Sequence, residues 1–524
     1  MEIVIIGGGP HALAALAALV GADGQCQDVR GAVAVLDPGA QFMQQWHTRF
    51  AALEIEYLRS PAFVHPVAFL PAALVNFAIR EGRTTELVDA PVTDVKGWVP
   101  TTDLSTPLLK TLPSSALFKD FCGSLAATLP HRWLSGSATR VSKDSSTGSY
   151  RVHYTTAGGT QERTVGARAV VLATGPVGKW NVPAPFEPHL AAARRIVHTE
   201  ELLVEGRGTL REEIARAIAA CSNADERGGR PARVLVVGGG ISAAQAALAA
   251  IRAGHHVVLR SRRPLQTRAF DIPSEWLDVR HADRLRFEFL CLPMEKRRAA
   301  VRAATTGGSI PATYVAELIR LSQSAGGKLC LEVDEGIDRS DVHAGTDGVI
   351  VNGESFDMVV LATGVSTGPS DSELYRSVQA LFDAPTVDGL PRVDSGLRWV
   401  PGENLFVLGA NAALELGPGA GNLVGAMRGA RIISNELHGL MTTRQHRLPG
   451  TCPARPIFQN KYAALLDGSE PEIEVLTRRL HLSPKAVLAL KTARERGKGG
   501  KPAKGQRGRC MVHGPRMHGR AIVF

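Results

Sequence analysis

Two short segments combine residues that could bind phosphate. They read Gly7-Gly8-Gly9-Pro10-His11-Ala12 and Gly238-Gly239-Gly240-Ile241-Ser242-Ala243, so both have the spacing G-x-G-x-x-A. In this pattern the first glycine permits a tight turn, the second lets a diphosphate approach the backbone, and the small last residue lets a helix pack against a strand. The phosphate would lie at the N-terminus of that helix. The repeat predicts two dinucleotide sites in one chain.

The residues that end the next strand differ between the two copies. The apolar run 33–36 is followed by Asp37, whose carboxylate could accept hydrogen bonds from the ribose of an adenosine. The run 256–259 is followed instead by Arg260, Arg262 and Arg263. A guanidinium binds a 2′-phosphate in bidentate fashion, whereas a carboxylate repels it, so the second site is expected to prefer NADP to NAD. A solvated run of arginines on the surface is the alternative.

Predicted strands and helices place these segments. Each glycine segment follows an apolar run typical of a buried strand and precedes an Ala/Leu-rich helical pattern. Two further strands end in Ala-Thr-Gly, at Thr174-Gly175 and at Thr363-Gly364. Three alternating segments, within 137–165, predict a β-meander.

The last predicted strand is followed by a glycine-rich segment. A strand over 404–410 contains Gly409, and it is followed by Leu-Gly-Pro-Gly-Ala-Gly-Asn-Leu at 416–423 and a helix as far as Arg431. A backbone with so few side chains at a helix start could lie against a flat ring and bond its polar edges.

Composition limits the class of protein. A chain of 524 residues should contain two to four domains, each with its own core. The seven cysteines are scattered without a C-x-x-C pair, which argues against a redox dithiol or a zinc ribbon, and no metal site is predicted. No run of about 18 apolar residues predicts a membrane helix, and no leader pattern precedes the first strand. We therefore expect a cytoplasmic protein.

The last eighty residues differ from the rest of the chain in charge and composition. The net charge is +10, and residues 491–520 contain ten Lys and Arg against one acid, Glu495. We expect 445–524 to be a C-terminal extension with short helices and a largely disordered basic tail, which could bind acidic partners weakly. The rest of the chain is close to neutral, so its composition gives no support for nucleic-acid binding.

Together these motifs resemble the flavoproteins with two dinucleotide-binding domains, and among them the lysine/ornithine N-monooxygenase-like proteins. The resemblance covers about residues 1–440. Besides the glycines it is carried by Trp46, the segment 53–61, the segment 113–121, Val197-His198-Thr199 and Leu361-Ala362-Thr363-Gly364.

The resemblance implies two cofactors and a set of site residues. FAD would be held by Gly7, Gly9, Asp37, Trp46, Gly409, Asn422 and Leu423. NADPH would be held by Gly238, Gly240, Ala243 and one or more of Arg260, Arg262 and Arg263. The other candidate cofactor-binding residues are Pro10, Ala12, Thr174, Gly175, Thr363 and Gly364. Trp46 and Arg59 are the candidate catalytic residues. Hydride would pass from NADPH to the flavin, which would then react with O2 in a site protected from water.

Two residues depart from the pattern of the true amine hydroxylases. Those enzymes have an active-site glutamine and an active-site lysine at the positions that Glu54 and Arg59 take here. Arg59 could still bind a carboxylate or the nicotinamide, but Glu54 changes the charge, which argues against ornithine or lysine as the substrate. The F-x-G-x-x-x-H pattern of the Baeyer–Villiger and flavin-containing monooxygenases is not matched.

The sequence therefore predicts an α/β protein with two Rossmann-like domains, β-meander insertions and a basic tail. The expected limits are 1–200 and 366–440 for the FAD-binding domain, 228–365 for the NADPH-binding domain and 445–524 for the extension. The expected activity is that of an FAD- and NADPH-dependent monooxygenase acting on a small amine or other nucleophile. An NADPH oxidase or quinone-type reductase, and a regulatory flavoprotein that binds partners through its tail, are the alternatives. The two histidines His65 and His198 are expected to be structural.

Overall fold

The computed structural model of the protein divides into two compact units, Met1–His481 and Leu482–Phe524. The structure describes residues 1–21, 31–89, 111–156, 159, 161–175, 179–190, 194–204, 206–221, 230–305, 310–324, 326–334, 336–345, 348–365 and 372–442. All of these lie in the first unit. The predicted extension 445–524 and most of the linker expected at 222–231 lie outside the described residues.

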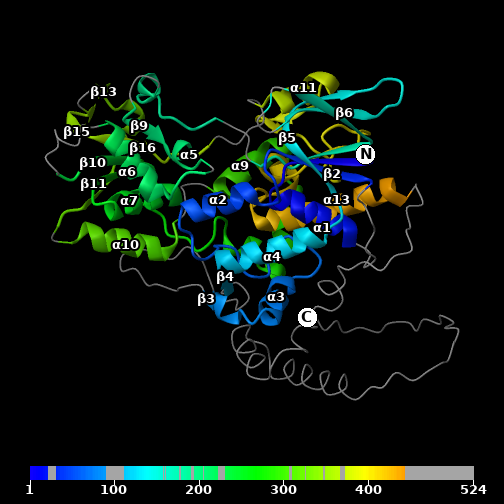
Figure 1. The fold of residues 1–524 in the computed structure, drawn as a ribbon, viewed down its shortest axis with the longest axis horizontal. Helices are drawn as coiled ribbons and strands as arrows, with labels where there is room; N and C mark the ends of the chain where they lie inside the picture. Colours follow the sequence, from blue (N-terminus) through cyan, green and yellow to red (C-terminus); the bar gives the residue numbers. More distant parts are fainter. Residues whose placement is uncertain are drawn as a thin grey trace, which may run out of the picture. The chain divides into compact units, whose positions relative to one another are not determined.

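The first sheet has seven strands in the order β19-β8-β1-β2-β5-β6-β7. Figure 1 labels β2, β5 and β6 of this sheet. From β19 to β5 neighbouring strands run parallel, and β5, β6 and β7 form an antiparallel meander. The strands at its centre are apolar and buried, as expected where helices cover both faces of a parallel sheet. Their bounds are β1 (Ile3–Ile6), β2 (Val33–Asp37), β5 (Arg132–Lys143), β6 (Tyr150–Thr156), β7 (Glu162–Ala167), β8 (Ala169–Leu172) and β19 (Leu405–Val407).

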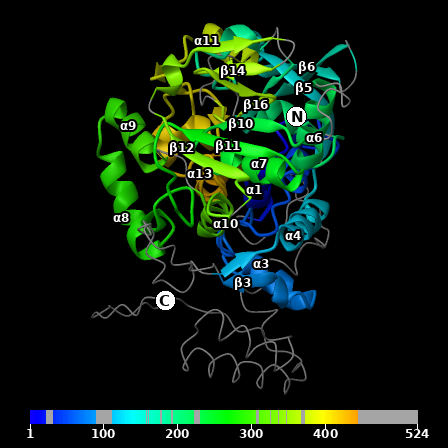
Figure 2. The same ribbon diagram turned by 90° about the vertical axis from the view of Figure 1, so that its left-hand side faces the viewer.

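The second sheet has five parallel strands in the order β12-β11-β10-β16-β9. Figure 2 shows β16, β10, β11 and β12 side by side, with α7 (Ile241–Arg252) running across them. The bounds are β9 (Ile196–His198), β10 (Arg233–Val237), β11 (His256–Ser261), β12 (Leu329–Val333) and β16 (Met358–Leu361). A three-stranded antiparallel sheet joins β13 (Val342–Ala344), β14 (Val349–Val351) and β15 (Glu354–Phe356). Two short ribbons pair β3 (Leu87–Asp89) with β4 (Thr111–Pro113) and β17 (Thr386–Val387) with β18 (Leu390–Pro391).

The helices fill the space around these sheets. Their bounds are α1 (Pro10–Gly21), α2 (Gln44–Ala52), α3 (Ala73–Arg80), α4 (Ser115–Thr128), α5 (Thr199–Leu202), α6 (Leu210–Cys221), α8 (Val279–Leu290), α9 (Met294–Thr305), α10 (Ala312–Ser322), α11 (Glu373–Phe382), α12 (Ala413–Leu416) and α13 (Leu423–Thr442). Helix α1 packs along α13, and its residues 11–20 are all buried. The alternating side chains of the second sheet contribute to two cores, one with α6, α7 and α10 and one with β13, β14 and β15.

Most sequence-based expectations for the elements are confirmed. The expected meander is present. In addition, Ser114 caps α4, because its Oγ accepts a hydrogen bond from the Leu117 amide. Strand β9, just before the expected boundary at residue 200, pairs with β16 in the second sheet. The domain limits stay predictions.

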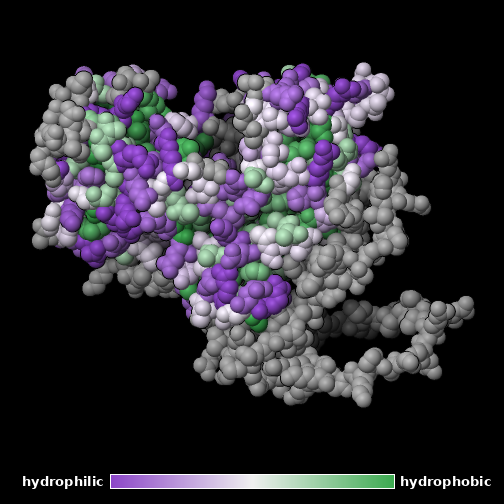
Figure 3. All heavy atoms as spheres, viewed as in Figure 1, coloured by the Kyte–Doolittle hydropathy of each residue, from purple (hydrophilic) through white to green (hydrophobic). Residues whose placement is uncertain are grey.

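Figure 3 shows the hydropathy of one face of the molecule. Polar side chains cover most of the described surface in Figure 3, and apolar residues appear there in small patches. Within the described ranges, no helix is both long enough and apolar enough to cross a bilayer.

The first glycine turn provides a stability test. Gly7 has a φ of +113°, and a Cβ there would lie closer than 3.0 Å to the Ala173 carbonyl oxygen. We expect Gly7→Ala to lower the free energy of unfolding by about 2–4 kcal/mol, because it combines backbone strain with overpacking. Gly9→Ala is the matched control, since a Cβ at Gly9 would meet no atom within 4 Å. Urea unfolding without added ligand measures both, and equal stability of the two variants would contradict this explanation.

Candidate functional site

The two glycine turns are built in the same way. Gly7 follows β1 and Gly238 follows β10, and both have positive φ angles, +113° and +151°. A Cβ at Gly238 would lie closer than 3.0 Å to the Ala362 carbonyl oxygen, just as one at Gly7 would approach Ala173. Each glycine turn therefore packs against one of the predicted Ala-Thr-Gly turns, at the carboxyl edge of its sheet. In open α/β sheets this edge is where ligands bind.

The free space beside these turns suits a dinucleotide. A Cβ at Gly9, Gly175 or Gly364 would meet no atom within 4 Å, so these glycines border open space. Pro10 is the first residue of α1, where its missing N–H costs nothing, and the start of this helix offers backbone amides to a diphosphate. Ala12 and Ala243 are fully buried, as close packing of helix on strand requires. Gly240 is the N-cap of α7.

Asp37 lies at the end of β2, next to the first glycine turn. Its carboxylate accepts hydrogen bonds from the amides of Gly8 at 2.6 Å and Gly39 at 2.8 Å. These bonds fix the carboxylate at the carboxyl edge of the sheet, and a carboxylate can accept further hydrogen bonds, such as those of ribose hydroxyls.

Ser261 takes the equivalent place in the second sheet. The Gly7 amide donates to the Leu36 carbonyl, and the Gly238 amide donates to the Arg260 carbonyl, so Leu36 corresponds to Arg260. Asp37 therefore corresponds to Ser261, which is buried with its Cβ 3.2 Å from a Cβ placed on Gly239. Serine brings no negative charge to this position, so it would not repel a 2′-phosphate.

Arg260 is buried and paired, which argues against the expectation that it binds a 2′-phosphate. Only 5% of its side chain is exposed, and its guanidinium pairs with Glu332 at 2.7 Å and with Glu354 at 3.0 Å. The two carboxylates engage Nε and Nη2, and Nη1 is buried, so the guanidinium is not presented to a ligand at the surface. Arg262 and Arg263 are exposed, and Arg262 makes a 3.2 Å ion pair with Asp338, which is also exposed. These two arginines remain the candidates for a 2′-phosphate.

Comparison with known proteins identifies the fold. The profile of the family described as pyridine nucleotide-disulphide oxidoreductase matches residues 105–313. Ornithine hydroxylase PvdA from Pseudomonas aeruginosa, in its reduced form, has a TM-score of 0.60 at 18% identity, over 84% of this chain and 99% of that one. No curated protein sequence matches significantly. The chain therefore shares the fold of that hydroxylase, with two Rossmann-like sheets.

Two further structures support this assignment. The cadaverine monooxygenase DfoA from Erwinia amylovora, solved with FAD, has a TM-score of 0.58 at 17% identity, over 86% of this chain and 97% of that one. The ornithine N-hydroxylase KtzI from Kutzneria sp. 744, solved with reduced FAD, NADP+ and L-ornithine, has a TM-score of 0.58 at 16% identity, over 84% and 99%. The expected resemblance to N-hydroxylases is thus confirmed, and the expected class, an FAD-dependent oxidoreductase, agrees with these matches.

A buried tyrosine that the sequence did not single out supports the first Ala-Thr-Gly turn of this flavoprotein fold. Tyr375 on α11 accepts a hydrogen bond from the Asn411 side chain at 2.9 Å, and its hydroxyl lies 3.2 Å from the Thr174 Oγ1. Burial raises the pKa of Tyr375, so the phenol stays protonated. The hydroxyl links the turn at Thr174 to the segment after Gly409. No local pattern marks Tyr375, because its partners are distant in sequence.

The glycine-rich closing segment lies over a buried histidine. Gly409 has a φ of +77°, and a Cβ there would lie 3.7 Å from Nε2 of His11. Burial lowers the pKa of His11 to about 4, so the imidazole is neutral, although contact with the Gly421 backbone opposes this shift. Asn422 immediately precedes α13, and Leu423 begins it. Their predicted contact with a flavin ring stays a prediction.

Trp46 belongs to an aromatic cluster on α2. Its ring stacks on Phe50 with centroids 3.5 Å apart, and it lies 5.2 Å from Phe118. The Met43 amide, just before this helix, donates to the Gly8 carbonyl at 2.7 Å, so the start of α2 is joined to the first glycine turn. These contacts account for the position of Trp46, and its role next to a flavin stays a prediction.

Arg59 joins the first sheet region to the loop after β11. Its guanidinium makes a 2.5 Å ion pair with Asp271 and donates to the carbonyl oxygens of Arg268 and Ala269. Burial lowers its pKa, and the charge of Asp271 opposes that shift. Arg59 is therefore already engaged as a cross-link. Glu54 is exposed with a φ of +51° and lies just beyond the end of α2.

The two histidines that we expected to be structural are buried. His65 Nε2 lies 3.1 Å from the Pro71 carbonyl oxygen, its Nδ1 accepts from the Val67 amide, and burial lowers its pKa to about 4. His198 Nδ1 accepts from the Glu200 amide at 3.2 Å and caps α5. These hydrogen bonds hold the local backbone in each case. The structural role of the two histidines stays a prediction.

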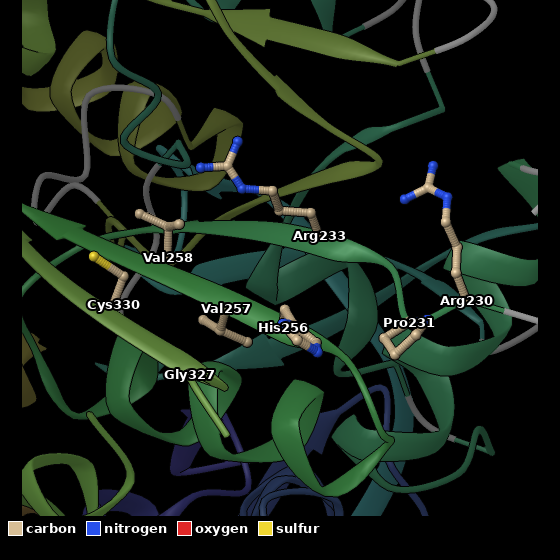
Figure 4. Close-up of a pocket in the computed structure, with 8 residues that line it drawn as sticks. All are labelled: Arg230, Pro231, Arg233, His256, Val257, Val258, Gly327 and Cys330. Atoms are coloured by element: carbon tan, nitrogen blue, oxygen red, sulfur yellow. The ribbon is translucent and has the colours of Figure 1, made fainter. Parts of the chain in front are cut away.

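A hollow of about 430 Å³ lies at the opposite edge of the second sheet (Figure 4). Arg233 and His256 begin β10 and β11, so this is the amino edge of the parallel strands. Figure 4 shows the side chains of Arg233, Val258 and Cys330 rising from the same face. Ligands of this fold bind at the carboxyl edge, so the hollow does not belong to the coenzyme site.

Tyr375→Phe tests the support of the first Ala-Thr-Gly turn. Removing the hydroxyl leaves the buried Asn411 amide without its acceptor, so we expect the free energy of unfolding to fall by about 1–2 kcal/mol. Tyr154→Phe is the control, because the hydroxyl of this buried tyrosine makes no hydrogen bond with the part of the chain that the structure describes. Urea unfolding measures the stability of both variants. An equal loss of stability in the two would contradict the bridging role of the Tyr375 hydroxyl.

Proposed function

We propose that this protein is an FAD- and NADPH-dependent monooxygenase that uses O2 to oxygenate a small amine or another nucleophile. The proposal rests on one observation. The two glycine turns have the same construction, but the side chains beside them differ in charge. Asp37 stands beside the first, whereas Ser261 followed by Arg262 and Arg263 stands beside the second. A carboxylate suits the ribose of FAD, and a serine with two arginines suits the 2′-phosphate of NADPH.

The residues of the chain would act mainly by binding and orientation. Gly7, Gly9 and the start of α1 would hold the FAD diphosphate, with Asp37 on the ribose. Gly238, Gly240 and the start of α7 would hold the NADPH diphosphate. When bound, the flavin would supply the redox chemistry, taking a hydride from NADPH and passing the electrons to O2.

The class of substrate is supported by the similar structures. Their titles name an ornithine hydroxylase and a cadaverine monooxygenase, and both substrates carry a primary amine. Hydroxylation of such an amine converts amine, O2, NADPH and H+ to hydroxylamine, water and NADP+. We extend the amine or nucleophile class to this chain without extending either substrate.

An NADPH oxidase is the second candidate, favoured by one observation. Glu54 and Arg59 take the positions of the active-site glutamine and lysine, yet Glu54 is exposed and Arg59 is engaged by Asp271 and two backbone carbonyls. Without side chains that orient an amine, O2 would be reduced to peroxide instead of oxygenating a substrate.

Oxygen consumption with NADPH separates the two candidates. The purified protein would be mixed in air with NADPH and one amine at a time, including ornithine, lysine and cadaverine, and hydroxylamine and hydrogen peroxide would be measured. We expect one amine to give oxygenated product in place of most of the peroxide. Peroxide equal to the NADPH consumed, with every amine, would exclude the monooxygenase and favour the oxidase.

Ser261→Asp tests the assignment of the second site. The new carboxylate would repel the 2′-phosphate and accept the ribose hydroxyls of NADH instead, so the KM for NADPH should rise about 10- to 100-fold while that for NADH falls or stays constant. Arg263→Ala should raise the KM for NADPH alone. Arg284→Ala on α8, an exposed arginine paired with Glu288, is the control. An unchanged ratio of the two KM values in Ser261→Asp would overturn the assignment.

A further inference from the structure

The direction in which a dinucleotide lies on the second sheet follows from the strand order. If the proposed function is right, its diphosphate lies at the turn after β10 and its adenosine end lies near Ser261, at the end of β11. Strand β16 is the neighbour of β10 on the other side, and β9 follows it. The nicotinamide end would therefore extend over the carboxyl ends of β16 and β9, because a dinucleotide spans the point where the strand order reverses.

An exposed tryptophan lies at that end of the sheet. His198 is the last residue of β9, and the indole of Trp180 stacks on it with ring centroids 5.2 Å apart and planes only 5° apart. His198 is fully buried, whereas 43% of Trp180 is exposed. One face of the indole is thus covered by the imidazole, and much of the remaining ring surface is open.

The stack is held in place by backbone contacts. Trp180 forms a β-bridge with Val365, and the Asn181 amide donates to the Gly364 carbonyl at 2.9 Å. Thr363 Oγ1 also donates to the Asn181 carbonyl. The segment that carries Trp180 is therefore attached to the second Ala-Thr-Gly turn, which packs against the glycine turn of the same site.

The same edge faces the first sheet region. Glu200, two residues after His198, makes an ion pair with Arg49 on α2. Helix α2 starts beside the first glycine turn, through the bond from the Met43 amide to Gly8. A nicotinamide near Trp180 would therefore lie on the side of the coenzyme site that is joined to the flavin-binding region.

The chemistry of the stack favours a flat cation. The face of an indole carries negative electrostatic potential and attracts a cation placed over it. Burial lowers the pKa of His198, so the imidazole behind the indole is neutral and does not repel a positive charge on the other face. The nicotinamide ring is a flat cation when oxidised and is uncharged when reduced.

We propose that Trp180, supported by His198, is a binding platform for the nicotinamide ring and binds the cationic ring of NADP+ in preference to that of NADPH. A single exposed apolar residue needs no function by itself, and Phe287 on α8 is more exposed, at 69%. Trp180 differs because it is stacked on a buried imidazole and lies at the carboxyl edge of the second sheet.

Isothermal titration with two ligands tests the platform. NADP+ carries the nicotinamide, and adenosine 2′,5′-bisphosphate carries the same 2′-phosphate without it. Each is titrated into the flavin-loaded wild-type protein and into Trp180→Leu, Trp180→Phe and the control Phe287→Leu. We expect Trp180→Leu to weaken NADP+ about tenfold and to leave the bisphosphate within about twofold, since the face of a tryptophan ring attracts a cation. Trp180→Phe should restore part of the affinity, and Phe287→Leu should bind both ligands as wild type does.

Each other result overturns the inference in a distinct way. Unchanged affinities in Trp180→Leu would show that the indole does not contact the nicotinamide. Equal weakening of both ligands would show that Trp180 only supports the fold of the site. A wild-type protein that binds neither ligand would overturn the proposed function, and the platform with it.

Discussion

The close contact between each glycine turn and the following Ala-Thr-Gly turn is the constraint on which the site depends. At Gly7 and again at Gly238 the backbone passes so near a carbonyl oxygen that a Cβ would not fit, and the φ angles are positive. Beside this contact, a Cβ at Gly9, Gly175 or Gly364 would meet no atom within 4 Å, so space is left there. Any larger residue at the first glycine would alter the shape of the phosphate-binding turn.

The two sites then differ in the residue that ends the strand beside each glycine turn. Asp37 and Ser261 stand at equivalent positions, so one site has a fixed carboxylate and the other has none. Side chains alternate along a strand, so Leu36 and Arg260, the residues before Asp37 and Ser261, point to the opposite face of their sheets. That alternation directs Arg260 toward Glu332 and Glu354 and leaves the exposed Arg262 and Arg263 beyond the end of β11.

Local patterns made most of the fold predictable. The glycine turns, the apolar strands before them and the meander all depend on residues within one segment, and the structure contains each of them. The site was less predictable where partners lie far apart in sequence. Arg59 is 212 residues from Asp271, and Arg260 is 94 residues from Glu354, so neither ion pair has a local signal. Tyr375 and Trp180 went unnoticed for the same reason, since their importance comes from the rings and hydroxyls that the fold brings beside them.

An anaerobic titration of the purified protein tests the central claim, that the first site holds FAD and the second delivers a hydride from NADPH. The visible absorbance of the bound flavin is followed while NADPH is added in the absence of O2 and substrate. We expect about one equivalent of NADPH to bleach this absorbance, and NADH to do so far more slowly. A protein that neither contains nor takes up FAD, or a bound flavin that NADPH leaves oxidised, would contradict it.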